Sequence, residues 1–175
     1  MIQKVEELEK WYRKKDPWGY EQSPEDKKRK EILLSEIPDR HYKRILDIGC
    51  GNGFITRDLP GENIVGIDIS KRAILRAKKN RQNRIQYKIG SIFDLSHLIH
   101  DKYDLVVITG VLYPNYIGYS LNLIYELIDE VISDNGILVS VHIDQWYKAR
   151  FPYLLLTQYF YNYKEYTHRL EIYVK

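Results

Sequence analysis

A glycine-rich turn preceded by an aspartate is the segment best suited to chemistry. The residues Asp47-Ile48-Gly49-Cys50-Gly51-Asn52-Gly53 come at the end of a short apolar run, 44–48, that is expected to be a buried strand. Glycines directly after such a strand let the backbone approach a ligand lying over the strand's carboxyl end. The spacing of the glycines departs from a dinucleotide fingerprint, and no Gly-Lys-Ser/Thr ending follows, which disfavours NAD and a P-loop phosphate site.

Polar residues also follow the next two expected strands, 64–68 and 85–89. Asp68 comes 19 residues after Gly49, and a carboxylate at this point can accept hydrogen bonds from both hydroxyls of a ribose. The segment Gly90-Ser91-Ile92-Phe93-Asp94 offers a polar side chain and a backbone N–H that could read an adenine edge. These positions together indicate a nucleoside-binding site.

The elements that position these residues alternate between strand and helix, which predicts a doubly wound α/β fold. Two more buried strands are expected at 105–109 and 137–143, and an antiparallel aromatic hairpin at 158–164 and 166–174 is expected to close the sheet edge. Helices are expected at 2–15, 23–37, 54–59, 71–80, 94–100 and 121–132.

Three ordered motifs resemble those of class I S-adenosylmethionine-dependent methyltransferases. They are the glycine turn, then Gly66-Ile67-Asp68-Ile69-Ser70, then Tyr103-Asp104-Leu105-Val106-Val107, and the resemblance covers about residues 41–143. It implies a Rossmann-like class I methyltransferase fold with a seven-stranded, mostly parallel sheet in the order 3-2-1-4-5-7-6 and helices on both faces. It also implies S-adenosyl-L-methionine as the cofactor.

The resemblance implies a role for individual residues. Gly49 and Gly51 approach the methionine part of the cofactor, Asp68 holds the ribose, and Ser91 with the Ile92 backbone faces the adenine. The family often has aspartate at the position of Ser91, so either its hydroxyl or Asp94 contacts the adenine amino group. The full expected cofactor-binding set is Asp47, Gly49, Gly51, Asp68, Ile69, Ser91, Ile92, Thr109, Trp18 and Arg29, with Arg29 available for the cofactor's carboxylate.

The N-terminal part shows a second resemblance, to the nodulation-protein-S-like methyltransferases. It is carried by Asp16-Pro17-Trp18-Gly19-Tyr20, by Ser23-Pro24-Glu25 with the basic helix after it, and by Val111-Leu112-Tyr113. Those enzymes N-methylate an amino sugar at the end of a chitin-type oligosaccharide. We expect residues 1–40 to form a helical cap or lid and residues 41–175 to form the cofactor-binding core of a single domain.

Methyl transfer from a sulfonium is an in-line displacement in which the protein mainly positions a nucleophile and excludes water, so a dedicated base is optional. Candidate catalytic residues must lie at the carboxyl ends of the fourth and fifth strands, which selects Tyr113, His142 and Asp144. Each has a structural alternative: packing under the N-terminal segment for Tyr113, a hydrogen-bonded core histidine for His142, and a helix cap for Asp144.

Composition narrows the remaining possibilities. A chain of 175 residues fits one domain, its single cysteine, Cys50, gives no basis for a disulfide or a thiolate metal site, and its net charge of +3 is only mildly basic. No membrane segment, signal peptide or metal is expected, and the cytoplasm is the default location. We expect a small-molecule methyl acceptor, such as an amine.

Two other function classes stay open. Nucleic acid is the less favoured acceptor because the Asn/Asp-Pro-Pro-Tyr/Phe tetrad of base-methylating relatives is absent after the fourth strand; an RNA or protein methyltransferase and an inactive cofactor-binding subunit remain alternatives. Sixteen tyrosines stand out in the composition. Those of the hairpin are expected to cover the sheet, and an aromatic acceptor pocket is expected from Tyr12, Tyr20, Tyr113, Tyr116 and Tyr119.

Overall fold

Seven strands form one sheet in the order β3-β2-β1-β4-β5-β7-β6 in the computed structural model, which describes residues 5–14, 16, 17, 19–80 and 82–175. Strands β1 to β5 run parallel, β7 is antiparallel to β5, and β6 is antiparallel to β7. The expected strand order is confirmed. The strands are β1 (Tyr42–Ile48), β2 (Gly61–Asp68), β3 (Ile85–Ile89), β4 (Tyr103–Thr109), β5 (Ile132–Ile143), β6 (Leu154–Tyr163) and β7 (Tyr166–Val174).

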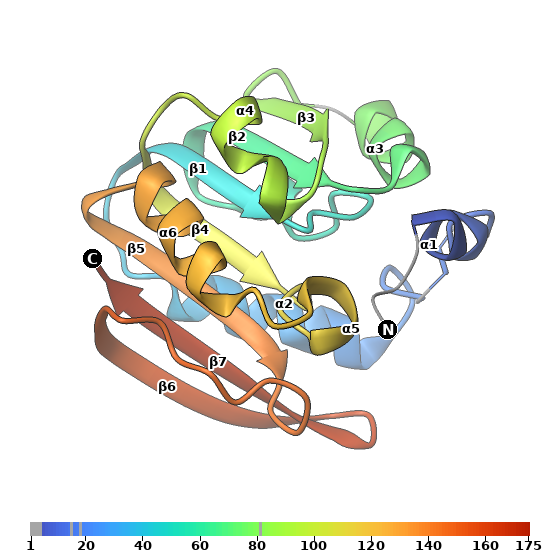
Figure 1. The fold of residues 1–175 in the computed structure, drawn as a ribbon. Helices are drawn as coiled ribbons and strands as arrows, with labels where there is room; N and C mark the ends of the chain where they lie inside the picture. The colour runs from blue at the N-terminus through green and yellow to red at the C-terminus, as the bar shows by residue number, and fades with distance from the viewer. Residues whose placement is uncertain (1–4, 15, 18, 81) are drawn as a thin grey trace.

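Helices cover both faces of this sheet (Figure 1). One face packs against α2 (Pro24–Glu36) and α3 (Lys71–Ala77), and the other against α4 (Leu95–Leu98), α5 (Pro114–Ile117) and α6 (Leu121–Val131). Helix α1 (Val5–Trp11) lies near α3 (Figure 1). Short 3-10 helices occupy Thr56–Asp58, Lys78–Asn80 and Ile92–Asp94. Among the described residues, no helix has the length and apolar character needed to cross a bilayer.

Several elements differ from the expectation: α5 was not expected, β6 begins at Leu154 and not at 158, and the helix after the glycine turn and strand β5 also differ. The helix expected at 54–59 is only the 3-10 turn Thr56–Asp58, and the chain leaves it in an extended conformation at Leu59, the residue before Pro60. Strand β5 begins at Ile132, directly after α6, and not at the expected residue 137, and so includes the polar residues 133–135. A register shift against β4 and the positive φ of 60° at Asn135 accommodate them.

The central strands are buried on both faces, which is why they appear in the sequence as nearly continuous apolar runs. In β1, Leu46 and Ile48 pack into the core beneath α4 and α6, whereas Ile45 packs into the core beneath α2 and α3. All three side chains are almost completely shielded from solvent. The sheet is therefore a rigid support for the loops at its carboxyl edge.

A buried carboxylate ties α2 to the end of the β6–β7 hairpin. Ser23 begins the helix by accepting a hydrogen bond from the Asp26 backbone N–H, at 3.2 Å. The fully buried Asp26 side chain then accepts from Arg29 Nε, at 3.2 Å, and from the Tyr163 hydroxyl, at 2.8 Å. Lys164 Nζ lies 3.7 Å from the same carboxylate. We call these four residues, Asp26, Arg29, Tyr163 and Lys164, the clamp.

Removing the Tyr163 hydroxyl should weaken the clamp. We expect Tyr163→Phe to lower the free energy of unfolding by about 1–2 kcal/mol, because a hydrogen bond to a buried carboxylate is lost. The matched control is Tyr159→Phe on the same strand, where the ring is 45% exposed and removal of the hydroxyl should change the free energy by less than about 0.5 kcal/mol. Urea denaturation measures both, and equal losses would contradict the clamp.

Candidate functional site

A cavity of about 570 Å³ opens at the carboxyl edge of the sheet, the position at which open α/β sheets bind ligands. Its wall is built from α1, from the loops after β1 to β4, and from the end of the β6–β7 hairpin. Trp18 lies outside the described residues. The predicted cofactor-binding residues that line the cavity are Asp47, Gly49, Gly51, Asp68, Ile69, Ser91, Ile92, Thr109 and Arg29.

The glycine turn forms one end of the cavity because its backbone adopts conformations that favour glycine. Gly49 has a φ of +78° and Gly51 a φ of +55°. A β-carbon at Gly49 would collide with the side chain of Val111, and one at Gly51 would lie 3.2 Å from the Tyr12 hydroxyl. The turn therefore presents bare backbone to the cavity.

The Asp68 carboxylate connects this turn to the start of α3. One oxygen accepts from the Gly51 backbone N–H at 2.9 Å, and the other accepts from the Ser70 backbone N–H at 2.8 Å. Burial raises the pKa of Asp68 to about 6, although both hydrogen bonds act in the opposite direction. Ser70 in turn caps α3 and donates to Glu9 of α1 at 2.8 Å. The position of Asp68 fits a group that receives ligand hydroxyls beside the glycine turn.

Two more polar groups of the turn face inward. Asp47 accepts from the Thr56 hydroxyl at 2.6 Å, and burial raises its pKa to about 7. Asn52 also lines the cavity, and its buried Oδ1 atom has no hydrogen-bond partner within the described residues. A buried acceptor without a partner is costly, which makes this side chain a candidate to accept a hydrogen bond from a ligand.

Ser91 and Asp94 close the turn after β3. The Ser91 backbone N–H and hydroxyl both donate to one oxygen of Asp94, at 2.8 and 2.7 Å, and these bonds lower the Asp94 pKa. Ser91 lines the cavity, whereas Asp94 is outside the lining and supports Ser91 from behind. The structure therefore favours Ser91 over Asp94 as the residue that faces a ligand.

Arg29 extends from α2 and lines the cavity. Its side chain is 8% exposed and lies between two aromatic rings, 5.2 Å from the ring centre of Tyr20 and 5.8 Å from that of Tyr163. Its Nε atom donates to Asp26, as described for the clamp. A fixed, partly shielded guanidinium of this kind is suited to a carboxylate ligand.

Two of the three predicted catalytic residues, Tyr113 and His142, pack edge to face with ring centres 5.6 Å apart, but the three do not share the cavity. Tyr113 lines the cavity, and its hydroxyl accepts from the Ile143 backbone N–H at 2.9 Å. His142 lies outside the lining, with Nε2 accepting from Leu112 N at 3.3 Å and Nδ1 lying 3.0 Å from the Ser140 hydroxyl. Burial lowers the His142 pKa to about 3, so the ring is neutral and holds the loop after β4 in place.

Asp144 also lies outside the cavity lining. Its carboxylate accepts from Lys148 Nζ at 2.6 Å and from Arg169 Nη1 at 2.8 Å. The bond from Lys148 lowers the Asp144 pKa. These contacts give Asp144 a structural position between β5 and β7, and only Tyr113 of the three candidates is placed to contact a ligand.

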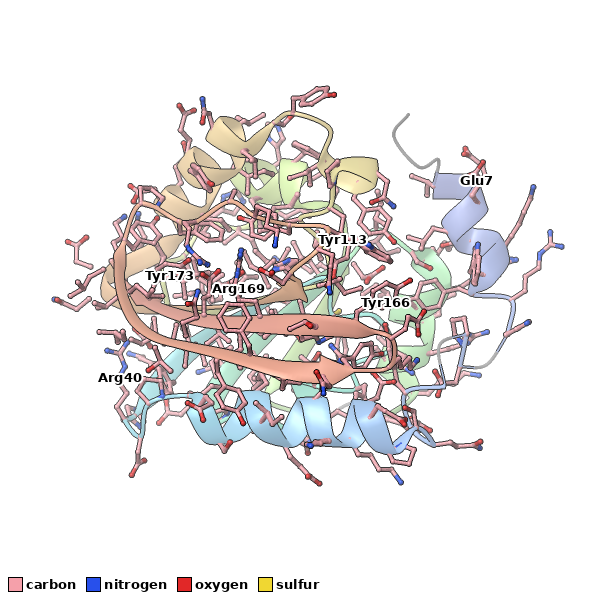
Figure 2. The ribbon with its side chains drawn as sticks, turned by 90° about the horizontal axis from the view of Figure 1, so that it is seen from below. Glu7, Arg40, Tyr113, Tyr166, Arg169 and Tyr173 are labelled. Atoms are coloured by element: carbon pink, nitrogen blue, oxygen red, sulfur yellow. The ribbon has the colours of Figure 1, made fainter. Side chains whose placement is uncertain are left out.

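Sequence reasoning did not predict that the turn between β6 and β7 contributes to the cavity wall. Figure 2 shows that Tyr113 and Tyr166 lie toward the end of the sheet that carries the β6–β7 turn, while Tyr173 and Arg40 lie toward the opposite end. Tyr119 was expected in the pocket but is fully exposed. The lining residues that were not assigned to the site from the sequence include Asn52, Trp146, Tyr163, Lys164, Tyr166 and His168. The predicted antiparallel hairpin could have indicated these residues. A strand that runs antiparallel to β5 must begin at the carboxyl end of β5, where the cavity lies.

Within the described part of the chain, no group of three or more His, Cys, Asp or Glu residues is arranged to hold a metal ion.

The strand order, together with the glycine turn and Asp68 at the carboxyl edge of the sheet, defines a Rossmann-like class I methyltransferase fold. A family model described as a methyltransferase domain matches residues 39–169. The chain belongs to this methyltransferase domain family.

Known proteins with similar sequences match only part of this chain. A ribosomal protein L11 methyltransferase of Dictyoglomus turgidum is 37% identical over 83 residues, covering 43% of this chain and 27% of that protein. A malonyl-[acyl-carrier protein] O-methyltransferase of Bacillus cytotoxicus is 33% identical over 90 residues, covering 46% and 31%. The chain spans about one sixth to one third of the length of the curated relatives it matches.

Solved structures match over most of the chain. The N-methyltransferase NodS from Bradyrhizobium japonicum WM9, solved in complex with S-adenosyl-L-homocysteine, has a TM-score of 0.83 at 20% identity and covers 98% of this chain and 97% of its own. A Pseudomonas syringae methyltransferase structure has a TM-score of 0.69 at 16% identity, covering 86% and 98%. At these identities the likeness establishes the fold.

The buried neutral His142 predicts how stability depends on pH. Its pKa in the folded protein, about 3, is below the ordinary value of 6.5, so the unfolded chain binds a proton first and stability is lost as the pH falls below about 6.5. We expect His142→Gln, which does not titrate, to reduce this loss by up to about 1.4 kcal/mol for each pH unit below 6. Urea denaturation at about pH 7, 5.5 and 4.5 provides the measurement; parallel pH curves for the two proteins would contradict it.

Proposed function

We propose that this protein transfers a methyl group from S-adenosyl-L-methionine to a small-molecule acceptor. The observation that carries the proposal is the single cavity that joins the glycine turn and Asp68 at one end to an aromatic wall, which includes Tyr113 and Trp146, at the other. The first end suits a nucleoside with a charged amino-acid tail. The second end offers space for another reactant.

The residues of the cavity fit the proposed cofactor. Gly49 and Gly51 leave room for the methionine part, Asp68 receives the ribose hydroxyls, and Ser91 with the Ile92 backbone meets the adenine edge. Asn52 Oδ1 supplies an acceptor for a cofactor donor such as its ammonium group. Arg29 holds the carboxylate, while Asp47, Ile69 and Thr109 complete the lining.

The bound cofactor supplies an electrophilic methyl group on a sulfonium that is already a good leaving group. The chain's own contribution is to align the acceptor and exclude water. Val5, Leu8 and Tyr12 line the cavity from the N-terminal segment, which supports the role of residues 1–40 as a cap over the site. Tyr113 forms the wall at the end of β4, where the acceptor approaches.

We further infer that the acceptor atom is an amine nitrogen that arrives uncharged. The acceptor half of the cavity, which we define as Tyr113, Tyr116, Trp146, Tyr163, Lys164, Tyr166 and His168, contains no carboxylate among its described residues. A cationic amine would meet no opposite charge there, and Lys164 would favour its neutral form. Resemblance to the nodulation-protein-S-like enzymes also supports an amine.

Cofactor binding provides the first test. We expect wild-type protein to bind S-adenosylhomocysteine and Asp68→Ala to bind it at least about 10-fold more weakly, because the ribose loses its charged acceptor. Asp134→Ala, which removes an exposed aspartate of β5, is the matched control and should bind normally. Isothermal titration calorimetry measures both. Absence of wild-type binding at millimolar ligand would contradict the proposed function.

A second experiment tests the role of Arg29. We expect Arg29→Gln to weaken S-adenosylhomocysteine binding about 10-fold but to leave the binding of 5′-methylthioadenosine unchanged, because only the former carries a carboxylate. The second ligand also reports on folding, since a disrupted cavity would lose both. Equal losses for the two ligands would place Arg29 away from the carboxylate.

A further inference from the structure

Two rows of aromatic side chains meet at the acceptor half of the cavity. In the first row the rings pack edge to face: the ring centres of Tyr113 and Trp146 are 5.3 Å apart at 81°, and those of Trp146 and Tyr166 are 4.8 Å apart at 61°. In the second row, Tyr163 stacks on His168 at 4.1 Å, with an interplanar angle of 19°. Tyr113 and Tyr166 belong to the core on the α6 side of the sheet and Tyr163 to the core on the α2 side, so aromatic side chains from both faces of the sheet line this half of the cavity.

The polar groups of this half are basic or neutral. Lys164, at the turn of the hairpin, lines the cavity and is 37% exposed at its side chain. His168 is 5% exposed, and its Nδ1 atom lies 3.2 Å from the Tyr161 hydroxyl. Burial lowers the pKa of His168 to about 3, so the imidazole is an uncharged hydrogen-bonding group. Lys164 is therefore the only fixed charge among the described residues of the acceptor half.

The acids near Lys164 lie outside the cavity lining. Asp26 accepts from Arg29 Nε and lies 3.7 Å from Lys164 Nζ, so the two cations share this carboxylate. Hydrogen bonds from the backbone and from Ser23, with a smaller contribution from the charge of Lys164, lower the pKa of Glu25; neither Glu25 nor Asp26 lines the cavity. A ligand in the acceptor half consequently meets the ammonium group of Lys164 without meeting an acid.

We propose that the acceptor is a flat-ring acid, which stacks between the aromatic rows and places its carboxylate or other anionic group against Lys164. The inference rests on the proposed function and deepens it by giving the chemical class of the acceptor. The ring carries the amine that is methylated, and the neutral imidazole of His168 is available to accept a hydrogen bond from it. A polyhydroxylated amino sugar would instead offer no anionic group to Lys164.

Binding to protein saturated with S-adenosylhomocysteine tests the inference without knowledge of the natural acceptor. The probes are 4-aminobenzoate, its uncharged amide, cyclohexanecarboxylate and glucosamine, with affinities from calorimetry and ligand-observed NMR. We expect 4-aminobenzoate to bind at least about 10-fold more tightly than the amide or glucosamine, because only it offers an anion to Lys164. It should also bind more tightly than cyclohexanecarboxylate, which cannot stack.

Variants separate the charge of Lys164 from its bulk. Lys164→Gln should remove the preference for the acid over the amide, and Lys164→Arg should keep it. Lys79→Gln, on an exposed lysine outside the cavity, is the matched control and should also keep it. The affinity for S-adenosylhomocysteine should stay unchanged in Lys79→Gln, and it is measured in both Lys164 variants so that acid and amide are compared at saturation with this ligand.

The outcomes distinguish the two proposals. Failure of the wild type to bind S-adenosylhomocysteine would contradict the proposed function itself. Normal cofactor binding with no acid bound at millimolar concentration, with acid and amide bound alike, or with glucosamine bound most tightly, would overturn the acid acceptor alone. Retention of the preference in Lys164→Gln would also overturn it.

Discussion

The hydrogen bonds of the Asp68 carboxylate hold together the part of the molecule where a ligand can bind. One oxygen binds the Gly51 N–H and the other binds the Ser70 N–H, so a single side chain joins the glycine turn to the start of α3. Through Ser70 the same network reaches Glu9, and the Arg72 side chain also binds Glu9. The shape of the turn, the start of α3 and the position of α1 therefore depend on one buried carboxylate.

The direction of the strands determines which residues form the cavity wall opposite Asp68. Strands β1 to β5 all end at the same edge, and because β7 runs antiparallel to β5, the turn between β6 and β7 lies at that edge too. The pairing of Ile143 with His168 fixes this placement. The clamp at Asp26 then holds the turn against α2, so residues more than 100 positions after the glycine turn form its opposite wall.

The sequence was most informative where structure is local. Strands β1 to β4 begin within three residues of their expected starts, since parallel strands buried on both faces appear as continuous apolar runs. The glycine turn and Asp68 were found for the same reason, because their spacing sets their geometry. The hairpin wall depends on strand register across the sheet, and this information is not contained in any short motif.

The sequence was least informative about burial. Residues of the same type at nearby positions differ in their exposure and in whether they line the cavity. His142 and His168 lie on neighbouring strands at the same end of the sheet, yet only His168 reaches the cavity. Tyr119 and Tyr116 are three residues apart, yet Tyr119 is fully exposed while Tyr116 lines the cavity. Such distinctions follow from packing in three dimensions, which residue type and spacing do not specify.

Protonation differs between the two halves of the cavity, and this difference bears on how the proposed reaction would proceed. At the end of the cavity formed by the glycine turn, burial raises the pKa of Asp47 to about 7 and that of Asp68 to about 6. In the acceptor half, burial raises the pKa of Tyr113 to about 12 and lowers that of His168 to about 3, so neither changes charge near neutral pH. Neither group is therefore suited to remove a proton before methyl transfer. A nucleophile that is already uncharged, and that loses its proton to solvent afterwards, is the kind that this half of the cavity can serve.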